Sequence, residues 1–293
     1  MPAQSAIRAF FDAPTNTISY LVADPASGAA AVIDPVLDFD AASGAVDVRS
    51  ARAMLDAAAA QGWRVALILE THAHADHLSA ASWLRRQTGA KVAIGSRITE
   101  VQRSFAPRFA ASDIAPDGAD FDLLLDDGAT LPLGALTIEV LHTPGHTPAC
   151  ASYCIGDAVF VGDTLFMPDY GTARCDFPGG DARTLYRSIQ RLLALPGDTR
   201  MFLCHDYKAP GRDQFAWETS VAEQRRANIH VHNGVSEEEF VAMREARDAT
   251  LAAPRLILPA IQVNIRAGRF PPPDADGLVR LRLPVSARGP EAE

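Results

Sequence analysis

Lysine, cysteine and long apolar stretches are scarce in this chain of 293 residues. The only lysines are Lys91 and Lys208, and the four cysteines form no C-x-x-C pair and no disulfide framework. The simplest interpretation is a reduced, cytoplasmic protein. No apolar run reaches membrane-spanning length, and the N-terminus lacks the apolar stretch of a signal peptide. We therefore expect no membrane segment.

Positive charge is also in deficit. The net charge of −9 argues against a nucleic-acid partner. Hydrophobic residues make up 48% of the chain, which is ample for a large core. No repeat and no shift of composition marks a boundary, so we predict one domain over 1–293 with a C-terminal extension from about 230. The sequence leaves the oligomeric state open, with a homodimer as one option.

Short apolar strands and helices alternate along the chain. Strands are expected at 7–11, 19–22, 30–33, 65–70, 91–94, 136–141, 151–155, 159–161, 201–204 and 278–285, and a polar loop at 36–49. Helices are expected after caps at Ser50, Asp181 and Ser236, directly after position 77, and near 97–103 and 216–228. This order suggests an α/β sandwich of four layers, with two mainly antiparallel sheets and helices outside.

The segment Thr71-His-Ala-His-Ala-Asp-His77 is the strongest chemical signal. Three imidazoles and a carboxylate lie within six positions, directly after an apolar run of buried-strand type at 65–70. Neutral imidazoles and carboxylates are the usual ligands of zinc, iron and manganese. Burying four such groups without partners would be costly, so the segment predicts a metal site.

Three further stretches place histidine or aspartate at strand ends. They are His142-Thr-Pro-Gly-His146, Gly162-Asp163-Thr-Leu-Phe166 and His205-Asp206. Each follows an apolar strand, so each side chain can emerge at the same sheet edge as the 71–77 turn. We interpret His142 as a strand-end histidine outside the ligand set. Cys175 and Cys204 lie near the predicted site, where small buried residues are the better interpretation than nucleophiles.

These motifs together resemble the metallo-β-lactamase superfamily, in the expected order. The resemblance implies an αββα four-layer sandwich, which agrees with the order of strands and helices. It also implies the superfamily's full ligand set, which maps to His72, His74, Asp76, His77, His146, Asp163 and His205.

The stretch 166–186 resembles the persulfide dioxygenases, also called sulfur dioxygenases, which are similar to ethylmalonic encephalopathy protein. The matching segments are Gly171-Thr-Ala-Arg-Cys-Asp-Phe177, Thr184-Leu-Tyr186, His205-Asp-Tyr207, Glu223-Gln-Arg225 with Asn228, and Asn264-Ile-Arg-Ala-Gly268. Ala267 departs from the pattern, because some members carry cysteine there, so a role for that thiol does not transfer. The resemblance implies an Fe(II)-dependent dioxygenase that oxidises glutathione persulfide with O₂ to sulfite and glutathione.

One iron per chain is then implied, held by His72, His146 and Asp163 as a facial triad with open positions. His74, Asp76, His77 and His205 would surround this iron without binding it, or would hold a second metal. All seven ligand positions are present, so a dinuclear zinc hydrolase, such as a glyoxalase II-like thioesterase or a lactonase, stays open. The 166–186 segment favours the dioxygenase. A metal-binding sensor or scaffold without enzymatic activity is the third and least favoured alternative.

Glutathione is anionic, so a protein of net negative charge needs local cations to bind it. Arg174 is the first candidate, since it follows Asp163 by eleven residues and guanidinium groups bind carboxylates bidentately. The alternative role for Arg174 is a structural salt bridge to Asp176. Tyr207, Asn264 and Arg266 are further candidates for substrate binding.

Overall fold

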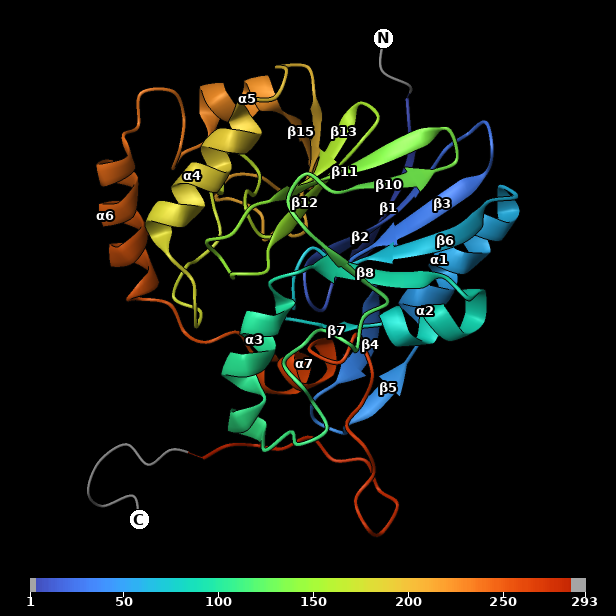
Figure 1. Cartoon of the computed structure of the whole chain (residues 1–293). Helices are drawn as coiled ribbons and strands as arrows, with labels where there is room; N and C mark the ends of the chain where they lie inside the picture. The colour runs from blue at the N-terminus through green and yellow to red at the C-terminus, as the bar shows by residue number, and fades with distance from the viewer. Residues whose placement is uncertain (1–3, 286–293) are drawn as a thin grey trace, which may run out of the picture.

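The computed structural model describes residues 4–285, which form two six-stranded β-sheets lying face to face (Figure 1). The first sheet has the order β1-β2-β3-β6-β8-β9, with the bounds Ala6–Asp12, Thr17–Ala23, Ala29–Ile33, Arg64–Leu69, Lys91–Gly95 and Leu123–Leu125. The second runs from β10 to β15 in chain order, with the bounds Thr130–Leu133, Leu136–His142, Ala151–Ile155, Ala158–Phe160, Arg200–Phe202 and Glu218–Ser220. A small third sheet, β5-β4-β7, consists of Ala45–Asp47, Val36–Asp40 and Leu78–Ser79.

Helices cover the outer face of each sheet. The first sheet shares an apolar core with α1 (Arg49–Ala60), α2 (Ala81–Thr88), α3 (Ile98–Phe105) and α7 (Ile257–Asn264). The second sheet shares another with α4 (Ala182–Leu193), α5 (Val221–Ala227) and α6 (Glu237–Asp248). A third core, containing Tyr20, Tyr153 and Phe160, fills the space between the sheets. The layers are therefore helix, sheet, sheet and helix, which confirms the predicted four-layer α/β fold of metallo-β-lactamase type.

Two of the three predicted helix caps are present. Asp181 accepts a hydrogen bond from the backbone of Thr184 at the start of α4, and Ser236 forms a capping box with Glu239 at the start of α6. The cap predicted at Ser50 is wrong, because α1 begins one residue earlier, at Arg49. The Ser50 hydroxyl instead donates to Asp38 on β4, at 2.9 Å.

Four other expectations about the elements are wrong. The first sheet is not mainly antiparallel, because β3, β6, β8 and β9 pair in parallel through helical crossovers. The expected loop at 36–49 is the β4–β5 hairpin, and β4 also pairs with β7. That pairing delays the helix after position 77, so α2 starts at Ala81. Residues 278–285 form no strand, because the side chain of Gln262 bonds both backbone groups of Arg282 instead.

No helix within residues 4–285 is long and apolar enough to cross a membrane. The single-domain organisation with an extension from about 230 stays a prediction, and so does the cytoplasmic location.

Candidate metal centre

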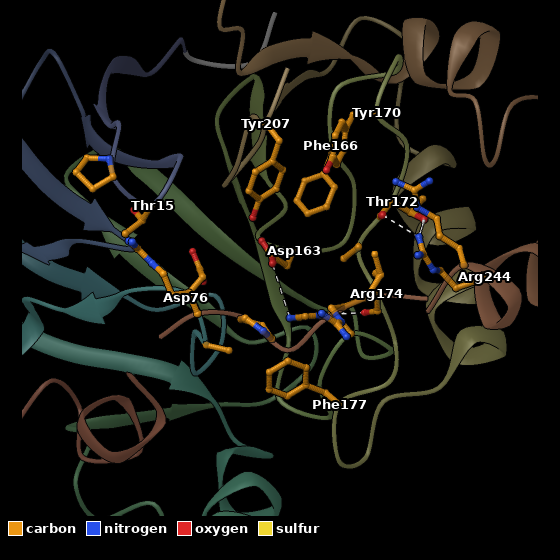
Figure 2. Close-up of a pocket in the computed structure, with 18 residues that line it drawn as sticks. Thr15, Asp76, Asp163, Phe166, Tyr170, Thr172, Arg174, Phe177, Tyr207 and Arg244 are labelled. Carbon is orange, nitrogen blue, oxygen red and sulfur yellow. Dashed lines mark hydrogen bonds and ion pairs between the residues drawn. The ribbon is translucent and has the colours of Figure 1, made fainter. Parts of the chain in front are cut away.

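The predicted strand-end segments converge at one place, at the inner end of a cavity (Figure 2). His72 lies just beyond β6, His146 beyond β11 and Asp163 beyond β13. One potential ligand atom from each of the three lies within 4.8 Å of the other two. All three residues are buried, and the most exposed of them is Asp163, at 8%. The structure therefore brings together the three residues that the resemblance assigned to the iron.

Hydrogen bonds fix the orientation of both imidazoles. His146 Nδ1 lies 2.8 Å from the carbonyl oxygen of Arg174, to which it can only donate. His72 Nδ1 lies 3.0 Å from the Thr71 hydroxyl, which itself donates to Asp34 and so accepts from His72. Each Nδ1 therefore carries the proton, and each Nε2 presents its lone pair. Such a bond on the far nitrogen is typical of metal-bound histidine.

The electrostatics of the three residues fit a bound cation. Burial, together with the neighbouring His74 and His146, holds the pKa of His72 well below its usual range, so its imidazole is neutral at pH 7. Burial raises the pKa of Asp163, against the opposing influence of His205 and His146. Within residues 4–285, His72 Nε2 and Asp163 Oδ1 are buried without a hydrogen-bond partner. Orphaned buried donors and acceptors of this kind fit a metal site.

A second group consists of His74, Asp76, His77 and His205, whose ligand atoms also lie within 4.8 Å of one another. His205 Nε2 lies 3.2 Å from Asp76 and 3.3 Å from Asp163, so the two groups adjoin. His74 is turned toward two buried carboxylates, with Nε2 at 3.0 Å from Asp34 and 3.6 Å from Glu70. The fold can therefore supply three residues to one metal and four to a second.

Glycines allow the ligand loops to approach their neighbours. Gly145, which precedes His146, has φ +136°, and a Cβ atom there would clash with the backbone of Leu185 on α4. Gly162, which precedes Asp163, has φ +51°, and a Cβ atom there would lie 2.6 Å from the Thr71 hydroxyl. The T-P-G-H and G-D-T motifs thus place their ligands through close backbone packing.

His142, Cys175 and Cys204 belong to neither of these two ligand groups. His142 Nε2 lies 2.8 Å from the carbonyl oxygen of Leu125, away from the centre. Cys175 and Cys204 are buried, and burial raises the pKa of both thiols. A protonated buried thiol is a poor nucleophile, which supports their interpretation as small core residues.

A cavity of about 310 Å³ opens from the centre toward solvent. Its wall combines aromatic and charged side chains, among them Asp163, Phe166, Phe177, Tyr207, Arg247 and Arg255. Figure 2 shows the hydroxyl end of Tyr207 directed toward Asp163. This volume lies in the range of small-molecule sites.

The structure separates the four predicted substrate-binding residues into two pairs. Arg174 and Tyr207 line the cavity. Asn264 instead donates to the carbonyl oxygens of His74 and His77, at 2.9 and 2.8 Å, and so holds the histidine turn. Arg266 is buried in an ion pair with Asp113. Neither Asn264 nor Arg266 belongs to the described lining of the cavity, and a role for them in substrate binding stays a prediction.

Sequence reasoning missed three cavity residues on or after α6, namely Arg244, Arg247 and Arg255. The spacing of Arg244 and Arg247 puts both on one helix face, which is the only local signal they give. It also missed Asp34, whose carboxylate bonds the backbone and hydroxyl of Thr71 beside His72. Asp34 directly follows β3, which is parallel to β6, so both strands deliver residues to one edge.

A family profile described as the Metallo-beta-lactamase superfamily matches residues 13–205. This range includes every residue of both ligand groups. The chain therefore belongs to the metallo-beta-lactamase superfamily, as its fold and its clustered histidines and aspartates indicate.

Within the superfamily, the resemblance to the persulfide dioxygenases is confirmed. The crystal structure of ETHE1 from Myxococcus xanthus has a TM-score of 0.72 and 33% identity, and the match covers 90% of this chain and 100% of that one. The mitochondrial persulfide dioxygenase ETHE1 of Homo sapiens is 31% identical, over 89% of this chain and 88% of the relative.

Other relatives have names of hydrolase type. A probable metallo-hydrolase of Burkholderia pseudomallei is 53% identical, over 96% of this chain and 99% of the relative. Glyoxylase B2 of Dictyostelium discoideum is 41% identical, over 98% and 99%. A beta-lactamase hydrolase-like protein of Agrobacterium fabrum is 52% identical over 95% of this chain, and the chain spans 64% of that relative's length. The comparisons therefore establish the superfamily, whereas the names of the relatives point to more than one reaction.

Proposed function

We propose that this protein is an Fe(II)-dependent glutathione persulfide dioxygenase. The observation that carries the proposal is the group of two imidazoles and one carboxylate, His72, His146 and Asp163, at the inner end of a cavity. Two histidines and one carboxylate with open positions are typical of non-haem Fe(II) oxygenases. Identities of 31% and 33% to proteins named persulfide dioxygenase ETHE1 and ETHE1 support the same reaction.

The iron would be held by the Nε2 atoms of His72 and His146 and by the carboxylate of Asp163. When bound, Fe(II) supplies positions for the substrate sulfur and for O₂ and the redox chemistry that joins them. In the proposed reaction, glutathione persulfide, O₂ and water give glutathione and sulfite. The S–S bond breaks, the terminal sulfur loses electrons and gains three oxygen atoms, and O₂ is reduced by four electrons.

The chain's own residues would bind and orient the substrate. Phe166 and Phe177 form apolar walls beside the centre, which exclude water from the reacting sulfur. Although 39% of Tyr207 is exposed, the burial of the rest of the residue, with the carboxylates of Asp76 and Asp163, holds its pKa well above its usual range, so its hydroxyl stays protonated. Because that hydroxyl is directed toward Asp163 (Figure 2), it can donate a hydrogen bond to an anionic persulfide held there.

A zinc-dependent hydrolase, such as a glyoxalase II-like thioesterase or a lactonase, is the second candidate. The group of His74, Asp76, His77 and His205 favours it, because these residues can hold a second metal beside the first. The names of the Burkholderia and Dictyostelium relatives point the same way. In that case the two groups would hold zinc ions, which would supply Lewis-acid activation of water for hydrolysis.

Oxygen uptake tests the proposal. Iron-loaded protein is mixed with glutathione persulfide in an oxygen electrode, and sulfite is quantified in the same sample. The proposal predicts one O₂ consumed and one sulfite formed per persulfide. Absence of oxygen uptake, together with rapid hydrolysis of S-lactoylglutathione by the zinc-loaded protein, would establish the hydrolase instead.

A further inference from the structure

Four arginines line the cavity that opens from the candidate metal centre, namely Arg174, Arg244, Arg247 and Arg255. Two of them are already neutralised. Arg174 donates through two nitrogens to Asp176, at 2.5 and 2.6 Å, and through the third to the carbonyl oxygen of Ala252. The buried Arg244 pairs with Asp248 on the same helix, at 2.6 Å.

The other two arginines are free to bind an anion. Arg247 lies on α6 and Arg255 in the segment that leads into α7, and both are exposed at the cavity. Among residues 4–285, neither guanidinium pairs with a carboxylate, in contrast to Arg174 and Arg244. The cavity therefore carries two uncompensated positive charges in a protein whose net charge is −9.

We propose that Arg247 and Arg255 form a carboxylate-binding subsite, which holds the anionic end of the substrate while its sulfur lies at the candidate metal centre. The identity of the substrate as a glutathione derivative rests on the proposed function. The subsite itself rests on the two arginines. Glutathione carries a carboxylate at each end of its tripeptide, several bonds from the sulfur of the central cysteine, so arginines away from the metal centre could bind one of them.

The lining of the cavity contains the kinds of group that such a substrate requires. Asp76 and Asp163 line the end at the metal centre, where a cation would neutralise them. Phe177 and Leu251 supply apolar wall, and the free arginines supply positive charge. A molecule with a soft sulfur and with carboxylates several bonds away finds complementary groups for both. Guanidinium groups bind carboxylates bidentately, which gives orientation as well as affinity.

Binding measurements with ligands of different charge test this subsite. Glutathione and its diethyl ester, which lacks both carboxylate charges, are titrated calorimetrically under anaerobic conditions into metal-loaded wild-type protein. The same titrations use Arg247→Gln, Arg255→Gln and the double variant. Arg226→Gln is the matched control, because Arg226 is an exposed arginine on α5 that pairs with Glu223 and is not among the described lining residues.

Each single substitution is expected to weaken glutathione binding about tenfold, since a charge-assisted hydrogen bond contributes roughly 1.5 kcal/mol, and the double variant more. The diethyl ester should bind weakly to the wild type and equally weakly to every variant. Arg226→Gln should bind glutathione as the wild type does, and metal content should stay unchanged throughout. A double variant with wild-type affinity for glutathione would overturn the subsite, as would wild-type protein that does not bind glutathione.

Oxygen uptake separates failure of the subsite from failure of the proposed function. If the double variant loses glutathione affinity but wild-type protein consumes no O₂ with glutathione persulfide, the subsite stands and the reaction is a different one. If wild-type and double-variant proteins consume O₂ with the same KM for glutathione persulfide, the reaction stands and the subsite is wrong.

Discussion

Three side chains would hold the iron in the proposed metal centre. We predict that His72→Ala, His146→Ala and Asp163→Ala each abolish iron retention and oxygen consumption, because each substitution leaves only two of the three proposed ligands. Iron analysis and an oxygen electrode measure both effects. The matched control is His142→Ala, which should keep its iron because its ring bonds the carbonyl oxygen of Leu125. Full activity in any of the first three variants would remove that residue from the centre.

His77 distinguishes the two kinds of metal site. In the iron enzyme it lies beside the metal without binding it, with its Nδ1 atom 3.4 Å from both Thr17 and Asp76. We predict that His77→Ala keeps about one iron per chain and loses about 10–100-fold in activity, as is usual for residues that support a metal site. If the wild type instead holds two metals and the variant one, the dioxygenase proposal is wrong.

At the residue scale, the sequence predicted the metal groups better than the substrate groups. His72, His146 and Asp163 each lie within four residues of the end of a strand, so local patterns were enough to find them. Arg247 and Arg255 reach the cavity only through the packing of α6 and the segment after it, which no local pattern records. For Arg174, the paired geometry with Asp176 agrees with the alternative of a structural salt bridge.

Among the elements, α6 holds the loop that orients His146. The buried Arg244 donates to the carbonyl oxygen of Thr172 at 3.1 Å, and its partner Asp248 accepts from the backbone of Cys175 at 2.7 Å. Between these two anchored residues lies Arg174, whose carbonyl oxygen accepts the proton of His146 Nδ1. The helix therefore acts on the metal centre through a backbone contact.

Loss of the Arg244–Asp248 pair should weaken both the fold and the iron site. We predict that Arg244→Met lowers the free energy of unfolding by about 3 kcal/mol, because it leaves the buried Asp248 without its partner. The variant should also lose iron faster to a chelator. Urea unfolding and chelator kinetics measure the two effects, with Glu245→Gln as an exposed control on the same helix. Unchanged stability and unchanged iron loss would show that α6 does not support the loop.

The elements themselves were predictable where their signals are local. The apolar runs of β3 and β6 and the caps of α4 and α6 involve residues a few positions apart, and all were found. The parallel pairing of β6 with β3 and β8 and the pairing of β4 with β7 join distant segments, and these were missed. Residues 278–285 have an apolar alternation typical of a strand, but no strand of the described structure lies alongside to pair with them.

For the whole molecule, Asp24 links the two sheets. Its carboxylate accepts from the backbone of Ala135 between β10 and β11, and from Ser27 and Ala26 after β2. Together these bonds lower the pKa of Asp24 to about 2, and the bond from Ala135 makes the largest contribution. Because this value lies below the usual carboxyl pKa of about 3.9, the bonds stabilise the fold fully above that pH. Their contribution is lost as the pH falls toward 2.

Asp24→Asn should therefore destabilise the protein at pH 6 and do so less at pH 3. Urea unfolding of wild-type and variant protein at both pH values measures the difference between them. Asp56→Asn, which removes an exposed carboxylate on α1, is the control and should have little effect at either pH. A wild-type advantage that is undiminished at pH 3 would show that the Asp24 carboxylate does not stabilise the fold through these bonds.

In the proposed enzyme, only one of the two adjoining ligand groups holds a metal, a single iron. The most direct test is the metal content of wild-type protein, expressed with both iron and zinc available, purified anaerobically and measured by elemental analysis. We predict one iron per chain and little zinc. Two zinc ions per chain, bound by both His72–His146–Asp163 and His74–Asp76–His77–His205, would contradict it.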